Sequence, residues 1–173
     1  GQITTTDLTI SLPPTLNFEP FGGYSKIAAV ERHHNTGKIG VAVAKGYGIK
    51  NGAVASSVSH DSHNIIVIGD NDVDMAIAVN EIIRTQGGYT VVENGKVYET
   101  LALPIMGLMS DAGFENVNEA LQRMIQKAHQ MGVASKIDPF VTLSFLALPV
   151  IPELRITPRG ICKMTAKGPA ILS

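Results

Sequence analysis

The segment YTVVENGKVYETL, residues 89–101, carries the clearest structural signal in the chain. Two runs rich in β-branched and aromatic residues, 89–93 and 96–101, flank the dipeptide Asn94-Gly95. Both turn residues tolerate the positive φ that a two-residue hairpin turn requires. The segment therefore predicts two antiparallel strands joined by a tight turn.

Short apolar runs upstream of this hairpin predict four more strands. They cover residues 27–30, 38–44, 53–58 and 65–68, and the last is a continuous apolar run, as expected of a central strand buried on both faces. The links between the first three runs are too short for the helical crossovers that parallel strands need. We therefore expect a mixed or mostly antiparallel sheet.

Two other segments show the helical period. The first helix is expected to start at a cap formed by Asp70 or Asn71 and to stop at the glycine pair 87–88. The second is expected to follow Ser110-Asp111 and to end at Gly132, because its apolar residues recur at spacings of four and three. The predicted fold class is α+β, with a mixed or mostly antiparallel sheet and two main helices.

Three parts of the chain are less clear. Periodicity alone assigns no element to the apolar residues 140–148. The string LALPI at 101–105 is echoed by LALPV at 146–150, which is weak support for an internal duplication, since a strand ending at proline gives such strings by chance. Residues 1–24, rich in proline and glycine, are expected to be a lead-in or linker, and residues 25–173 one α+β domain.

Length and composition exclude several classes of protein. A chain of 173 residues is the size of one domain with a substantial core. Its net charge of -1, with scattered Lys and Arg, argues against a nucleic-acid surface. No apolar run reaches the roughly 18 to 20 residues of a membrane span, and no signal peptide is visible. One cysteine, Cys162, excludes a disulfide framework, so we expect a cytoplasmic protein without nucleic-acid or membrane partners.

Polar residues suited to chemistry gather in two loops between predicted strands. Loops at strand ends place such side chains near one another at the surface. Adjacent residues of an extended segment point to opposite sides, so at most one of two neighbouring histidines should face a given site. The candidate residues for a binding pocket are Glu31, Arg32, His33, His34, His60, Asp61, His63 and Asn64.

These candidates also have simpler structural interpretations. His60, Asp61 and His63 are residue types that bind transition metals, but they form no strict ligand motif, and a loop histidine often caps a strand end. Glu31 has the chemistry of a general acid or base, yet a Glu31–Arg32 surface ion pair is the more common arrangement. We therefore expect no metal in this chain and keep His60, Asp61 and His63 as the weaker alternative.

Motifs of several other chemistries are absent from the sequence. It contains no phosphate-binding loop, no dinucleotide fingerprint after a strand and no nucleophile elbow. The pattern of cytidine-type deaminases needs more cysteines than the single one present. Residues alone therefore leave the catalytic groups unknown.

A set of spaced motifs runs in order along nearly the whole chain. They are ERHH with TG at 31–37, ASSVSHDSHN at 55–64, LPI and GLMSD at 103–111, DPF and TLSFLALP at 138–149, and IPEL at 151–154. The set resembles the C-terminal domain of the adenine deaminase family, in the amidohydrolase superfamily. Asn35 stands where we expect glycine in that family, and the tail after Gly160 matches poorly.

The resemblance implies a hydrolase whose catalytic TIM-like barrel lies outside these residues. In such an enzyme the barrel holds manganese or iron, and a metal-bound hydroxide converts adenine to hypoxanthine and ammonia. It further implies adenine as substrate, the barrel as partner, a homo-oligomer, and little activity of this chain alone. The eight candidate residues are then expected to close over the mouth of the barrel and to contact adenine or order the catalytic water.

Two other functions stay open at this point. The chain is alternatively a stand-alone module that binds a purine or a metal through its histidine loops, or a structural domain that packs the barrel or makes oligomer contacts. Binding of adenine or metal by the isolated chain would favour the first. Loss of oligomerisation on deleting the domain from the full enzyme would favour the second.

Overall fold

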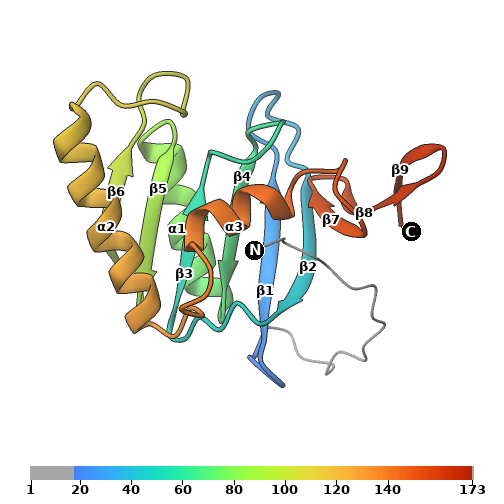
Figure 1. Cartoon of the computed structure of the whole chain (residues 1–173), viewed down its shortest axis with the longest axis horizontal. Coiled ribbons are helices and arrows are strands. Elements are labelled where there is room, and N and C mark those ends of the chain that lie inside the picture. The colour runs from blue at the N-terminus through green and yellow to red at the C-terminus, as the bar shows by residue number, and fades with distance from the viewer. Residues whose placement is uncertain (1–17, 173) are drawn as a thin grey trace.

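The computed structural model describes residues 18–172, which form two antiparallel sheets and three helices (Figure 1). The larger sheet has the order β2-β1-β4-β3-β5-β6, with strands β1 (Tyr24–Val30), β2 (Ile39–Lys45), β3 (Gly52–Ser56), β4 (Ile65–Gly69), β5 (Gly88–Glu93) and β6 (Lys96–Ala102). The smaller sheet joins β7 (Leu154–Thr157), β8 (Gly160–Thr165) and β9 (Gly168–Ile171). All strand pairs are antiparallel, which confirms the α+β class and the predicted sheet.

The hairpin at residues 89–101 is present as predicted. Strands β5 and β6 pair from Glu93 opposite Lys96, and the turn residues Asn94 and Gly95 have φ of 50° and 77°. Both values lie in the left-handed region that the two-residue turn demands. Most of the expected lead-in, residues 1–17, lies outside the described residues.

Helices cover the large sheet on both faces (Figure 1). Helix α1 (Asp72–Arg84) packs Met75 and Ile82 onto one face, while α2 (Phe114–Gln130) and α3 (Pro139–Leu146) pack onto the other. Strands β3 and β4 are buried at every residue, as predicted for the run 65–68. Each large apolar side chain buried there contributes about 1.5–3 kcal/mol to folding.

The predicted caps of the first two helices differ in outcome. Asn71 caps α1 as expected, because its side-chain oxygen accepts a hydrogen bond from the Asp74 amide at 2.8 Å. The predicted cap of α2 at Ser110-Asp111 is wrong, since the helix starts at Phe114 after Gly113. The Ser110 hydroxyl instead accepts from the Ala112 amide, in a turn that Gly113 with φ 84° directs into the helix.

A third helix occupies the segment that periodicity left unassigned. Asp138 caps α3 by accepting from the amides of Phe140 and Val141, at 2.9 and 2.8 Å. Residues 18–172 thus contain three helices where two main ones were expected. The first echo string ends strand β6 at Ala102, whereas the second ends helix α3 at Leu146, so the structure gives no support to a duplicated unit. No helix in residues 18–172 is long and apolar enough to cross a membrane.

Candidate functional site

All eight candidate residues lie at one end of the large sheet. Loop 31–38 joins β1 to β2 and loop 57–64 joins β3 to β4, and we call them together the polar loops. The pairings of Val30 with Ile65 and of Ser56 with Ile66 bring them to the same end. Figure 1 shows both connections at the top of the molecule, beside the loop that leads from β6 to α2.

Glu31 closes its own loop. Its carboxylate accepts hydrogen bonds from the amides of His33, His34 and Thr36, at 2.5, 2.8 and 3.1 Å, and from the Thr36 hydroxyl at 3.1 Å. The bond from the Thr36 amide contributes most to lowering the pKa of Glu31 from 4.5 to about 2, against an opposing effect of desolvation. A carboxylate used in this way is a loop-holding group, and it forms no ion pair with Arg32 within residues 18–172.

Arg32 connects the polar loops to the connection between β6 and α2. Its guanidinium donates to the Met106 carbonyl at 2.8 Å and lies directly over Gly107, where an added Cβ would collide with it. Burial lowers the pKa of Arg32 from its usual 12.5, and its Nε is buried without a hydrogen-bond partner. A guanidinium stays charged in proteins. The bond to the Met106 carbonyl therefore holds a positive charge between the polar loops and the loop after β6.

Asn64 and His33 fasten the two polar loops to each other. The buried Asn64 accepts from the Arg32 amide at 3.1 Å and donates to the Ser62 hydroxyl at 3.1 Å. The Nε2 of His33 donates to the Ser62 carbonyl at 2.6 Å, while His34 is exposed. Of the two adjacent histidines, only His33 therefore faces loop 57–64.

The remaining candidates surround the tip of loop 57–64. The rings of His60 and His63 lie 5.8 Å apart, and His60 packs on Phe145 of α3 at 5.3 Å. The Ser59 amide donates to Nδ1 of His63 at 3.4 Å, so the neutral ring carries its proton on Nε2. Burial, then repulsion from His60 and Arg32, lowers the pKa of His63 below its usual 6.5, which keeps the ring neutral near pH 7. Asp61 is largely exposed, 3.7 Å from His60.

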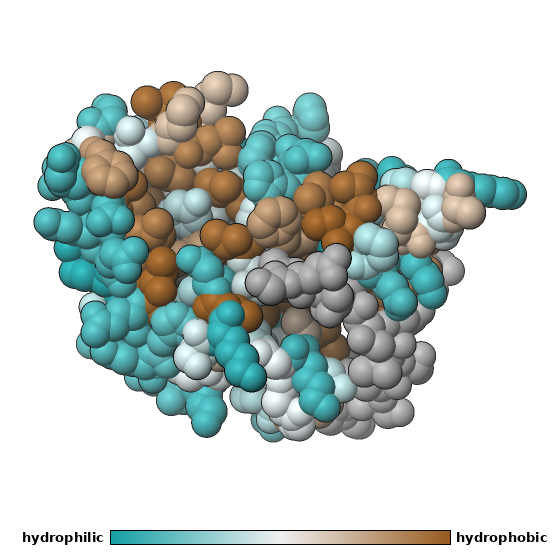
Figure 2. Space-filling model, in the orientation of Figure 1, coloured by the Kyte–Doolittle hydropathy of each residue, from teal (hydrophilic) through white to brown (hydrophobic). Residues whose placement is uncertain are grey.

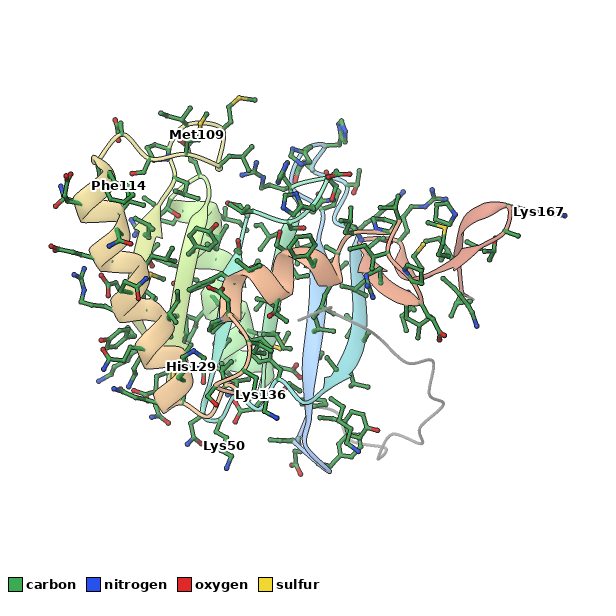
Figure 3. All side chains as sticks on the ribbon, in the orientation of Figure 1. Lys50, Met109, Phe114, His129, Lys136 and Lys167 are labelled. Atoms are coloured by element: carbon green, nitrogen blue, oxygen red, sulfur yellow. The ribbon has the colours of Figure 1, made fainter. Side chains whose placement is uncertain are left out.

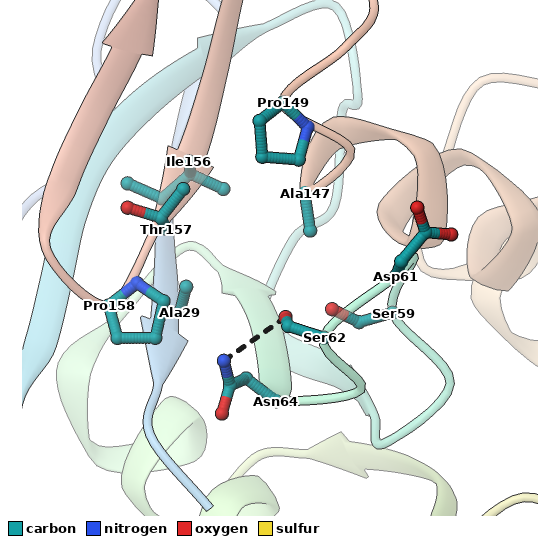
Figure 4. A pocket seen from close by; sticks show the side chains of 10 residues that line it. All are labelled: Ala29, Ser59, Asp61, Ser62, Asn64, Ala147, Pro149, Ile156, Thr157 and Pro158. Atoms are coloured by element: carbon teal, nitrogen blue, oxygen red, sulfur yellow. Dashed lines mark hydrogen bonds between the residues drawn. The ribbon is translucent and has the colours of Figure 1, made fainter. Parts of the chain in front are cut away.

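A small pocket opens beside loop 57–64 (Figure 4). Its volume is about 260 Å³, and it is bounded by β1, the polar loop, the end of α3 and β7. This is slightly below the roughly 300–1,000 Å³ of pockets that bury a drug-sized ligand. The residues that line it are Ala29, Ser59, Asp61, Ser62, Asn64, Ala147, Pro149, Ile156, Thr157 and Pro158.

The metal alternative finds no geometric support. In residues 18–172 no three His, Cys, Asp or Glu side chains are grouped so as to hold an ion, and this includes His60, Asp61 and His63. The described residues therefore do not fit a metal centre, and no chemical step in this domain is assigned to one.

Comparison with known proteins assigns the chain to a family. The sequence model described as the adenine deaminase C-terminal domain matches residues 2–167. The chain belongs to the adenine deaminase C-terminal domain family. Relatives named adenine deaminase include those of Desulfitobacterium hafniense, 51% identical over 162 residues, and Bacillus subtilis, 44% identical over 163 residues. These matches cover 93% of this chain and 28% of each relative, so this domain spans little more than a quarter of their length.

The protein named adenine deaminase in Clostridium acetobutylicum adds a similar comparison. It is 54% identical over 140 residues, which are 80% of this chain and 25% of that protein. In our chain, the loop after β6 is a part of the site region that reasoning from residue type missed. It contains no His, Glu or Lys, and only the motifs LPI and GLMSD at 103–111 drew attention to it.

Proposed function

We propose that this domain covers the active site of an enzyme that hydrolyses adenine to hypoxanthine and ammonia. The observation that carries the proposal is that some polar residues of the loops hold the loops together, while others have unused hydrogen-bonding atoms. Hydrogen bonds that hold the loops engage the polar groups of Glu31, Arg32, His33 and Asn64. His60 and His63 stand at the tip of loop 57–64 with ring nitrogens that no hydrogen bond within residues 18–172 engages, apart from Nδ1 of His63.

The neutral ring of His63 suits a purine. Adenine has ring nitrogens that accept hydrogen bonds and an amino group that donates them. With Nδ1 occupied by the Ser59 amide, His63 offers an Nε2–H donor toward a ring nitrogen of the substrate. His60, backed by the ring of Phe145, adds a flat surface next to it. Loop 57–64 therefore offers donors and apolar contact to a planar base.

The hydrolytic chemistry itself belongs to the part of the enzyme beyond these residues. There, as the family resemblance implies, a bound manganese or iron ion would supply an activated water. The domain's own residues bind and orient the base and exclude bulk water. A homo-oligomer and a cytoplasmic location remain predictions.

The test replaces His60 and His63 by alanine, singly and together, in the full-length enzyme. We expect kcat/KM for adenine to fall by roughly 10- to 100-fold in the double variant, because one or two hydrogen bonds to substrate are lost. His129→Ala is the matched control, since His129 sits at the far end of α2 and donates to the Val133 carbonyl (Figure 3). Unchanged turnover and unchanged adenine affinity in the double variant would refute the proposal.

A further inference from the structure

Large apolar side chains are exposed beside the polar loops, where β6 leads into α2. We call Ile105, Met106, Met109 and Phe114 together the apolar shelf, and their exposed fractions are 43%, 77%, 56% and 78%. Figure 2 shows hydrophobic residues gathered at this corner, and Figure 3 places Met109 and Phe114 on it. Contiguous exposed apolar side chains of this kind mark interaction surfaces.

The apolar shelf is held rigidly from beneath. The Ile105 and Met109 backbones bond to each other at 3.1 and 3.2 Å, and the Ser57 hydroxyl donates to the Gly107 carbonyl at 2.6 Å. Together with the bond from Arg32 to Met106, these contacts fix the loop to the polar loops. A surface ordered in advance loses little conformational entropy on binding, which favours docking.

Met106 occupies the tip of the shelf at a conformational cost. Its φ is 59°, in the left-handed region where a side chain costs about 1–2 kcal/mol relative to glycine. The side chain recovers little of this within the domain, because 77% of it is exposed. Methionine is a flexible, polarisable side chain that adapts to apolar partners. The cost is therefore consistent with a contact made outside the domain.

We propose that the apolar shelf docks against the catalytic part of the same adenine deaminase polypeptide. The curated relatives have nearly three quarters of their length outside the match, which supplies such a partner. The shelf shares one end of the sheet with His60 and His63, and Arg32 ties it to loop 57–64 by bonding to both Met106 and Asn64. Docking there sets the position of loop 57–64 over the active site, so this inference rests on the proposed function for the identity of its partner.

The size of the shelf favours a partner in the same chain over a second copy. Four such side chains expose roughly a few hundred Å², since one aromatic side chain accounts for about 150–250 Å². A stable complex of separate molecules buries about 800 Å² on each partner. Domains joined in one polypeptide meet at effective concentrations of about millimolar, so a smaller apolar contact suffices.

Cysteine labelling tests the inference without using catalysis. Met109→Cys and Phe114→Cys are made in the full-length enzyme and in the 173-residue chain, treated with a maleimide and followed by peptide mass spectrometry. The control is Val73→Cys on α1, which is 67% exposed and lies at the other end of the sheet. Native Cys162 is 2% exposed, and its slow labelling verifies that each protein is folded.

We expect both shelf cysteines to react at least about tenfold more slowly in the full-length enzyme than in the short chain, with Val73→Cys equal in the two. Equal rates at the shelf in both proteins would overturn the inference. Slowing that rises with the concentration of the short chain itself would also overturn it, in favour of a second copy. An accessible shelf together with a damaged His60 and His63 double variant would remove this inference and leave the proposed function standing.

Discussion

The polar loops and the apolar shelf adjoin each other at one end of the sheet, yet they use their side chains in opposite ways. In the polar loops, the side chains of Glu31 and Asn64 make hydrogen bonds within and between the loops. In the shelf, Met106 and Phe114 have little contact within the domain and point to solvent. The comparison teaches that residue type alone does not identify a binding surface. Most polar residues of the loops stabilise the loops themselves, whereas the apolar residues of the shelf are free to contact another part of the protein.

The largest effect is expected where the two regions meet, at Gly107. Its φ of 74° strains any side chain, and an added Cβ would have to displace the guanidinium of Arg32 from its place above the glycine. We expect Gly107→Ala to lower the free energy of unfolding by about 2–4 kcal/mol, from backbone strain and displacement of Arg32. The control Gly95→Ala, with φ 77° but open space, should cost about 1 kcal/mol in denaturant unfolding. Equal costs would show that Arg32 does not bind the regions together.

Asn64 tests whether the polar loops depend on each other. Asn64→Ala removes the bonds to the Arg32 amide and the Ser62 hydroxyl and leaves the partly buried Arg32 amide without this partner. We expect a loss of about 1–3 kcal/mol in the free energy of unfolding. The exposed Asn118 on α2 provides the matched control, and Asn118→Ala should change stability by less than about 0.5 kcal/mol. Similar losses of stability in both variants would mean that the hydrogen bonds of Asn64 do not stabilise the fold.

Glu31 makes the stability of the fold depend on pH, and the sign of this dependence follows from its lowered pKa. Because the folded pKa of about 2 lies below the usual 4.5, the carboxylate stabilises the fold fully above pH 4.5 and loses that contribution as pH falls toward 2. We expect Glu31→Gln to have a lower Tm than the unmodified chain at pH 6, and the gap to narrow between pH 4.5 and 2. A gap that stays constant across this range would contradict the assignment of Glu31 as the closing group.

The smallest expected change in stability is at Met106, and it is a gain where the other substitutions cause a loss. Met106→Gly relieves the left-handed backbone at the shelf tip, partly offset by the greater freedom of glycine in the unfolded chain. We expect the 173-residue chain to gain about 0.5 kcal/mol in the free energy of unfolding. The same change should speed maleimide labelling of Met109→Cys in the full-length enzyme. Destabilisation of the short chain would mean that Met106 has a packing role within the domain.

Local signals in the sequence predicted much of the fold. The Asn94-Gly95 turn and the Asn71 cap depend only on neighbouring residues, and both are confirmed. Helix α3 was not predicted because it is short and carries apolar residues on most sides, so it shows no period. The cap of α2 was misplaced because Ser110 uses its hydroxyl in a turn before Gly113.

The site region was predictable by place but not by role. Strand ends and polar residue types located both loops correctly. Which groups remain available depends on contacts between loops, such as His33 with Ser62 and Arg32 with Met106, and these are separated by 29 and 74 residues. Apolar residues in a loop give no chemical signal, so the shelf was visible only once its exposure was known.

The place of β3 in the sheet has a consequence for how the chain folds. Strand β3 lies between β4, its near neighbour in sequence, and β5, which follows only after helix α1. The β5–β6 hairpin closes through a two-residue turn, so it forms on the fast timescale of local contacts. Joining β3 to β5 closes a much longer loop and is slower. Until that step, the edge of the fully buried strand β3 is unpaired, and this interval is when the nascent domain most needs shielding from other chains.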